Sequence, residues 1–320
     1  MSDEYLWDRS GPPDPEIERL EQRLAPLRYR HRADLAGARA ARSRAWLAAA
    51  AAVLLAAVAT WTLRGPAAGA NTAWRVATVE GAARVNGRAA EVSMKLGAGQ
   101  LVHTGGASQL TLEAEDLGRI DLGPDSELRA ATNRKVALNR GMLHAFIWAP
   151  PREFVVDTPS ARAVDLGCEY TLNVDPDGNG LLRVSLGWVA FQFHNQESFI
   201  PAGAECVTRK REGPGIPYYQ DAPEALKHAL GRYERGDGAA LEQILQTARP
   251  RDGLTLWHLL TRVPDARRPE VFDRFAQLVP LSASISRDQV LRKNTQMIDL
   301  CWDALNLENT GWWRGWERKW

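Results

Sequence analysis

Cysteine and lysine are scarce in this chain of 320 residues, and its charges nearly cancel. Three cysteines without a CxxC pair exclude a disulfide-stapled scaffold and a cysteine-based zinc site. A net charge of +1 excludes a protein whose whole surface binds nucleic acid. GxSxG, HExxH and Walker-loop motifs are lacking, and the six histidines show no metal-ligand spacing. We therefore expect no enzyme, no catalytic residue, no metal site and no cofactor.

One long apolar run is present at residues 46–63, WLAAAAAVLLAAVATWTL. As a helix it would span about 27 Å, close to the thickness of a bilayer's hydrocarbon core. Trp46 and Trp61 lie near its ends, where interfacial aromatic residues are enriched. A helix in a soluble protein would show a polar face, and residues 46–63 have none. A signal peptide, for which residues 68–70 (AGA) offer a cleavage pattern, would not follow 45 residues of chain. We predict one uncleaved transmembrane helix.

The arginines around this run predict its orientation. Residues 26–45 contain six arginines, whereas residues 64–83 contain two. The positive-inside rule therefore places the N-terminus in the cytoplasm and exports residues 64–320, which in a bacterium means the periplasm. We expect a single-pass protein of the bacterial inner membrane.

The N-terminal tail contains one short amphipathic pattern. Asp14 and Pro15 are typical of a helix start, and Pro26 interrupts the helix. The apolar residues recur at helical spacing and would form one stripe: Ile17, Leu20, Leu24 and Leu27. A short helix with an exposed apolar stripe either frays or docks on a partner. These four residues are our candidate partner-binding site.

After residue 73 the pattern changes to short alternating runs separated by Gly or Pro turns, with a hairpin signal at Asn86-Gly87. The runs that predict strands include residues 136–138, 142–148, 170–174, 181–186 and 188–193. This spacing predicts an antiparallel sandwich or barrel-like β-domain over residues 74–208. Residues 209–217 (RKREGPGIP) have the composition of a linker. Beyond it, helical periods favour helices at residues 223–233, 239–247, 254–262, 270–278 and 288–305.

The β-rich stretch contains a series of motifs in a specific order. They are residues 101–105 (LVHTG) with Ser108, 117–122 (LGRIDL), 125–128 (DSEL), 138–141 (LNRG), 154–159 (FVVDTP) and 167–170 (GCEY). The series resembles the exported domain of the FecR family, membrane-anchored regulators of extracytoplasmic-function sigma factors. The family typically shows V-x-T-P followed by G-T-x-F. Here Cys168 replaces the threonine and Tyr170 the phenylalanine.

The resemblance implies a function in signalling. The exported FecR-like domain would receive a signal from an unidentified periplasmic or outer-membrane protein, and the cytoplasmic tail would bind a sigma factor. The rival interpretation is an envelope interaction or structural protein that has the same β-domain but no sigma factor as a partner. We read the glycines and Thr158-Pro159 of the motifs as turn residues without chemistry.

Three further features leave alternatives open. Cys168 and Cys206 are expected on next-but-one strands, about 9.5 Å apart, which favours two buried thiols over a disulfide. Residues 175–180 (DPDGNG) match the start of a calcium loop, but Leu186 stands at its twelfth position, which favours a polar hairpin turn. The tryptophans of residues 311–320 either pack on the preceding helices or lie at a membrane surface.

The sequence thus predicts a mixed, membrane-anchored protein with six segments. They are a cytoplasmic tail (1–45), a transmembrane helix (46–63), a linker (64–73), a FecR-like all-β domain (74–208), a second linker (209–222) and an α-helical region (223–320). The helical region is either an appendage packed on the β-domain or an array that binds another protein.

Overall fold

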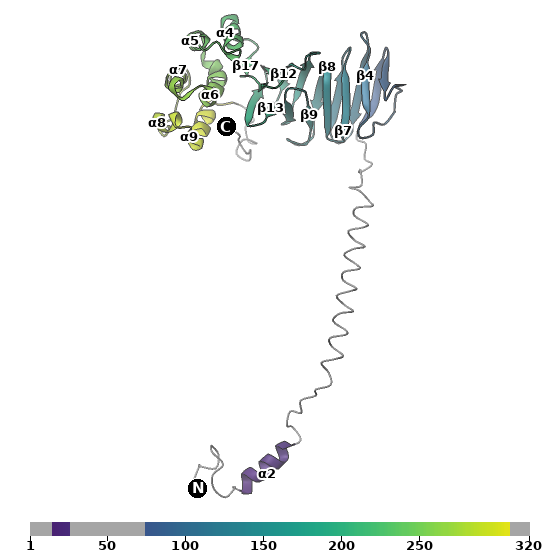
Figure 1. Cartoon of the computed structure of the whole chain (residues 1–320), viewed down its shortest axis with the longest axis vertical. Helices are drawn as coiled ribbons and strands as arrows, with labels where there is room; N and C mark the ends of the chain where they lie inside the picture. The colour runs from purple at the N-terminus through teal and green to yellow at the C-terminus, as the bar shows by residue number, and fades with distance from the viewer. Residues whose placement is uncertain (1–14, 26–73, 308–320) are drawn as a thin grey trace. The chain divides into compact units, whose positions relative to one another are not determined.

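The computed structural model describes residues 15–25 and 74–307. They belong to two separately packed units, Met1–Ala68 and Gly69–Trp320, and each is described by itself (Figure 1). Within the described residues, no helix is long and apolar enough to cross a membrane. The predicted span at residues 46–63, the linker at 64–73 and the tryptophan-rich end at 311–320 lie outside the described residues.

The first unit contains helix α2, Pro15–Leu24, which confirms the short helix expected in the tail. Proline is tolerated at a first helical position because its missing N–H would have no intrahelical partner there. Glu16 and Glu18 lie in the first turn and Arg23 in the last, as the helix dipole favours.

The second unit begins with two β-layers. Antiparallel pairing joins the strands of sheet A in a fixed order: β1 (Arg75–Glu80), β5 (Gln109–Ala114), β6 (Gly118–Leu122), the second half of β8 (Lys135–Ile147), β11 (Glu169–Val174), β12 (Gly180–Leu186) and β15 (Ala204–Arg209). Two short strands, β16 (Gly213–Pro214) and β17 (Tyr218–Tyr219), pair with the far edge of β15.

Sheet B is the facing layer. Its order is β3 (Arg88–Ala89), β2 (Ala83–Val85), β4 (Leu101–Thr104), β7 (Glu127–Thr132), the first half of β8, β9 (Val155–Asp157), β10 (Arg162–Asp165), β13 (Trp188–Phe193) and β14 (Gln196–Pro201). All pairs are antiparallel except β8 with β9, which is parallel. The expected antiparallel sandwich is therefore largely confirmed.

Strand β8 belongs to both layers. Its first half pairs with β7 in sheet B, and its second half pairs with β6 and β11 in sheet A. The strand bends at Gly141, whose φ is +92°, and a Cβ there would lie 2.4 Å from the Cα of Ser126. Only glycine combines this φ with so close an approach. The two strands expected at residues 136–138 and 142–148 are thus one bent strand.

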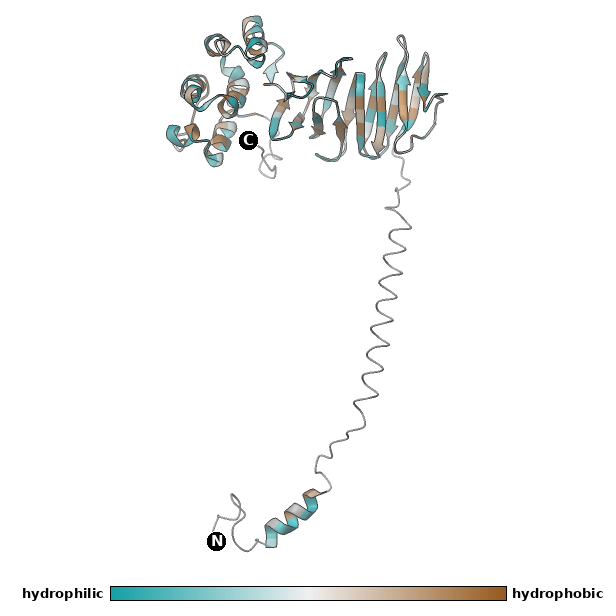
Figure 2. Cartoon of the chain, in the orientation of Figure 1, coloured by the Kyte–Doolittle hydropathy of each residue, from teal (hydrophilic) through white to brown (hydrophobic). Residues whose placement is uncertain are grey.

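Buried and more exposed side chains alternate along the strands, and the buried ones form the core between the layers. In β11 the side chains of Tyr170, Leu172 and Val174 are buried, and those between them are half-buried. Figure 2 shows hydrophobic and hydrophilic residues alternating along the strands in this way. The period of two places every second side chain on the same face, so each layer has one apolar face for the core.

Residues 209–222 are not a free linker, contrary to their composition. Strands β16 and β17 pair with β15, and Pro214, Ile216 and Tyr219 are buried. The Gly and Pro residues of this segment make turns between short paired pieces instead of an exposed connection.

The cysteines are free and buried, so the structure favours thiols over a disulfide. Cys206 lies opposite Leu182 of β12. Between these two strands the chain leaves sheet A at Gly187, makes the β13–β14 hairpin in sheet B and returns as β15. Residues 175–180 form the expected hairpin turn, in which Asp175 accepts hydrogen bonds from the backbone and side chain of Asn179 (2.9 and 3.0 Å).

A helical region follows at one end of the β-layers, near β13 and β17 (Figure 1). Its helices are α4 (Glu224–Glu234), α5 (Ala240–Thr247), α6 (Gly253–Arg262), α7 (Arg268–Leu278), α8 (Arg287–Leu291) and α9 (Thr295–Ala304). One helix expected at residues 288–305 is two. The chain turns at Lys293 (φ +55°), and the Asn294 side chain then caps α9 by accepting the Met297 N–H at 3.2 Å.

The helices share one hydrophobic core with the β-layers. The Trp302 ring lies 4.7 Å from Trp257 and 5.5 Å from Trp188 of β13, measured between centroids. His258 of α6 accepts the backbone N–H of Phe199 in β14 at 3.1 Å. Burial, with nearby Arg262, lowers the pKa of His258 to about 3, so the ring is neutral. The helical region is thus packed on the β-layers, one of the two arrangements expected.

Candidate partner-binding sites

Helix α2 presents the part of the predicted stripe that the structure describes. Leu20 and Leu24 lie one turn apart, with 60% and 51% of their surface exposed. Ile17 lies in the same helix, one turn before Leu20. Leu27 lies outside the described residues. Two exposed leucines on one face of a helix are typical of helices that dock in an apolar groove.

The motif at residues 154–159 ends in a partly buried turn between β9 and β10, in which Thr158 is half-buried and Pro159 is exposed. The Thr158 hydroxyl accepts the backbone N–H groups of Ser160 (3.3 Å) and Ala161 (3.0 Å). Ser160 then hydrogen-bonds to Thr208 of β15 at 2.6 Å, linking the turn to sheet A. These hydroxyl groups are occupied by structural bonds, and this agrees with our reading of the motif as a turn without chemistry.

The motif at residues 167–170 begins with a second buried turn. The Asp165 carboxylate accepts the Gly167 N–H at 2.7 Å and the Cys168 thiol at 2.5 Å. Burial raises the pKa of Asp165 to about 7, although these hydrogen bonds oppose the rise. Burial and the neighbouring carboxyl raise the pKa of the Cys168 thiol well above its usual value. The thiol is therefore a poor nucleophile, since the thiolate is the reactive form.

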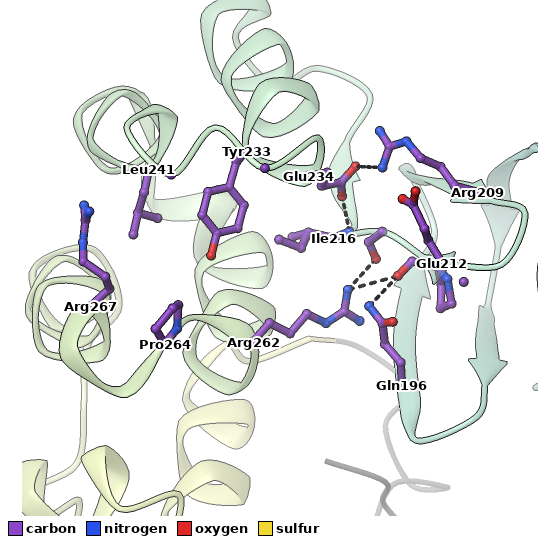
Figure 3. Close-up of a pocket in the computed structure, with 15 residues that line it drawn as sticks. Gln196, Arg209, Glu212, Ile216, Tyr233, Glu234, Leu241, Arg262, Pro264 and Arg267 are labelled. Carbon is purple, nitrogen blue, oxygen red and sulfur yellow. Dashed lines mark hydrogen bonds and ion pairs between the residues drawn. The ribbon is translucent and has the colours of Figure 1, made fainter.

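A hollow of about 600 Å³ lies where the helices meet the β-layers, and we call it the junction hollow (Figure 3). It is lined by residues of β14 to β16 and of the helical region: Gln196, Arg209, Glu212, Gly213, Pro214, Gly215, Ile216, Tyr233, Glu234, Gly236, Gly238, Leu241, Arg262, Pro264 and Arg267. The lining combines apolar side chains with three arginines, Arg209, Arg262 and Arg267.

Hydrogen bonds hold two walls of the hollow together. Glu234 of α4 accepts Arg209 Nη1 at 2.9 Å and the backbone N–H of Ile216 at 2.6 Å. Arg262, the last residue of α6, donates to the carbonyl oxygens of Pro214, Gly215 and Glu197 and to the Ser198 hydroxyl, at 2.6 to 3.2 Å. Burial lowers the pKa of Arg262, although the negative field of Glu234 opposes this.

The lining of the hollow contains no histidine, cysteine, serine or aspartate. Its titratable side chains are Glu212, Glu234, Tyr233 and the three arginines. In the part of the chain that the structure describes, no group of three or more His, Cys, Asp or Glu side chains could hold a metal ion.

No local pattern of the sequence predicts the hollow. Arg209, Glu212 and Ile216 lie in the segment that composition marks as a linker. Tyr233 and Glu234 lie at the end of α4, and Arg262 lies at the end of α6. No motif connects these residues, because they come together only through the pairing of β16 with β15.

A comparison with protein families matches part of the β-layers. The family model described as FecR protein matches residues 100–189, which run from β4 to the start of β13. None of the curated proteins matches the chain in sequence.

Two crystal structures of a "putative anti-sigma factor" from Parabacteroides distasonis ATCC 8503 are similar to the chain at 15% identity, with a TM-score of 0.34. The match covers 41% of this chain and 64% of that one, less than two thirds of its length. The assignment to a family therefore rests on the match to the family model. Residues 100–189 of this chain are a FecR domain, and the resemblance to the FecR family is confirmed.

Proposed function

We propose that this protein is a single-pass regulator in the bacterial inner membrane that relays an extracytoplasmic signal to a sigma factor. The FecR domain at residues 100–189 is the observation that carries the proposal. In the proposed arrangement, α2 lies in the cytoplasm, residues 46–63 span the membrane, and the unit Gly69–Trp320 is exported. The protein acts by binding and is not an enzyme.

The exposed leucines of α2 support its role as the contact with the sigma factor. Burying a leucine side chain in a partner's groove contributes about 2 kcal/mol, so two or three such residues give a useful affinity. The helix is short and marginal in isolation, and docking would stabilise it. A periplasmic or outer-membrane protein supplies the signal to the FecR domain.

The topology is tested by fusions in a bacterial host. Alkaline phosphatase, which needs disulfides formed in an oxidising compartment, should be active when fused after residue 320 and inactive when fused after residue 40. The reverse pattern, or a mature chain that begins near Asn71, would contradict the proposed orientation.

The docking of α2 is tested by a matched pair of substitutions. Leu20→Asp should weaken binding of the partner sigma factor by about 30- to 100-fold, because it puts a charge into an apolar contact. Gln22→Asp introduces the same charge at an exposed position on the other side of the helix and should change binding less than about threefold. Binding of residues 1–45 is measured by calorimetry.

Equal effects of the two substitutions would remove α2 as the docking helix. No binding of any sigma factor by residues 1–45 would favour the rival function, an envelope protein without a sigma-factor partner.

A further inference from the structure

We propose that the junction hollow binds a small organic carboxylate with a compact apolar body. This goes beyond the proposed function, which assigns no small-molecule ligand to the chain. The volume of about 600 Å³ is within the range of small-molecule sites, about 300 to 1,000 Å³.

Apolar side chains form much of the wall and set the character of the ligand's body. Ile216 of the β16–β17 connection and Leu241 of α5 are buried, and Pro264 follows α6. Figure 3 shows Leu241, Tyr233 and Pro264 on the helical side of the hollow and Ile216 near its centre. A ligand with a ring or a short branched chain would replace water against these surfaces.

The charges around the hollow favour an anion. Arg209 is paired with Glu234, and Arg267 is paired with Glu270. Arg262 donates to neutral oxygens, and no carboxylate of a described residue lies within ion-pair distance of it. Its positive charge is therefore only partly compensated, at a site of reduced dielectric constant. Glu212, the remaining acid of the lining, is exposed to solvent.

Tyr233 supplies a donor for the carboxylate. Its hydroxyl points into the hollow between α4 and α6 (Figure 3). Within the described residues this hydroxyl donates no hydrogen bond, and burial raises its pKa, so it is protonated at neutral pH. A carboxylate beside it would accept a hydrogen bond from this hydroxyl and face Arg262 and Arg267. Hydrogen bonds of this kind to a charged acceptor are stronger than neutral ones.

The test compares three probes that share one apolar body and differ in the polar end group and its charge: 3-phenylpropanoate, 3-phenylpropanol and 3-phenylpropylamine. The full chain in lipid nanodiscs is titrated with each and followed by calorimetry. We expect the carboxylate to bind at least tenfold more tightly than the alcohol, and the amine to bind most weakly. A peptide with a C-terminal phenylalanine tests whether a peptide carboxylate is accepted as well as a free acid.

Three variants locate the site. Tyr233→Phe should weaken binding of the carboxylate about five- to tenfold and leave the alcohol unchanged. Glu212→Gln should tighten carboxylate binding. Gly238→Phe should abolish binding by filling the hollow. It is suited to this test because a Cβ at Gly238 meets no atom within 4 Å, so the fold can accommodate a larger side chain.

Equal affinity for the three probes, or carboxylate binding that Gly238→Phe leaves intact, would overturn the proposal. So would binding that occurs only after residues 308–320 are deleted, because that segment would then be the occupant of the hollow. These outcomes are independent of sigma-factor binding, so the two proposals can fail separately.

Discussion

Replacing Arg262 by methionine should lower the free energy of unfolding of the unit Gly69–Trp320 by about 3 kcal/mol. The guanidinium joins the end of α6 to four acceptors in β14 and the β16 segment. Methionine keeps most of the apolar stem but leaves buried oxygen atoms short of a donor, and each such loss costs about 1–3 kcal/mol. Part of this cost is offset because the buried cation no longer needs to be desolvated.

For a unit of this size, the loss should lower the midpoint of thermal unfolding by about 6–12 °C. Tryptophan fluorescence is a suitable signal because Trp257 and Trp302 lie at the junction between the helices and the β-layers. Arg287→Met is the control, since Arg287 makes an exposed ion pair with Asp273 at 2.8 Å and should cost less than about 1 kcal/mol. Equal shifts for the two variants would show that Arg262 does not hold the junction.

The second large effect concerns pH. Asp165→Asn should become more stable relative to the unchanged protein as the pH rises from 4 to 8, by a total on the order of 4 kcal/mol. The folded protein holds Asp165 with a pKa of about 7, above the ordinary value of 3.8, mainly because the carboxyl is buried. The stability that its protonated form contributes is therefore complete below about pH 4 and is lost as the pH rises through 7.

Asparagine keeps the size of the side chain and can still accept the Gly167 N–H, but it does not ionise. Urea unfolding at pH 4.5, 6 and 8 gives the difference in free energy between the two proteins at each pH. A difference that stays constant across this range would mean that the pKa of Asp165 in the folded protein is not raised above its unfolded value.

Asp157→Asn is the control, because the pKa of Asp157 is lowered in the folded protein, whereas that of Asp165 is raised. Burial would raise the pKa of Asp157, but hydrogen bonds and charges of Lys135 and Arg162 outweigh it, so the pKa lies below its usual value. The stabilisation by Asp157 is present above the unfolded pKa and is lost only as the pH falls through the folded value. The difference for Asp157→Asn should therefore be flat between pH 6 and 8, where that for Asp165→Asn changes.

The sequence predicts a helix or strand well where nearby residues in the chain determine where it begins and ends. Helix α2 begins at Pro15 and ends before Pro26, and both prolines act through their own backbone. Strands β11, β12 and β13 lie within a residue or two of their predicted ranges, because alternation and the turns at Gly180 and Gly187 are local signals.

A glycine in the sequence does not by itself show whether a strand ends or bends. Gly187 separates two strands, whereas Gly141 bends one strand from sheet B into sheet A. The difference depends on Ser126, which lies against Gly141 in space and fifteen residues earlier in the chain. A sequence pattern cannot distinguish a glycine that ends a strand from one that bends it, because the deciding contact is distant.

Local patterns are enough to identify the apolar run at residues 46–63, the helix with Leu20 and Leu24, the order of motifs that resembles the FecR family, and the preference of the cysteines for buried thiols. The pairing of residues 213–219 with sheet A, and the placement of Tyr233 and Arg262 around one hollow, become visible only in the folded chain. The reason is physical. Local propensity acts within one turn or strand, whereas these features depend on pairing and packing between segments tens of residues apart.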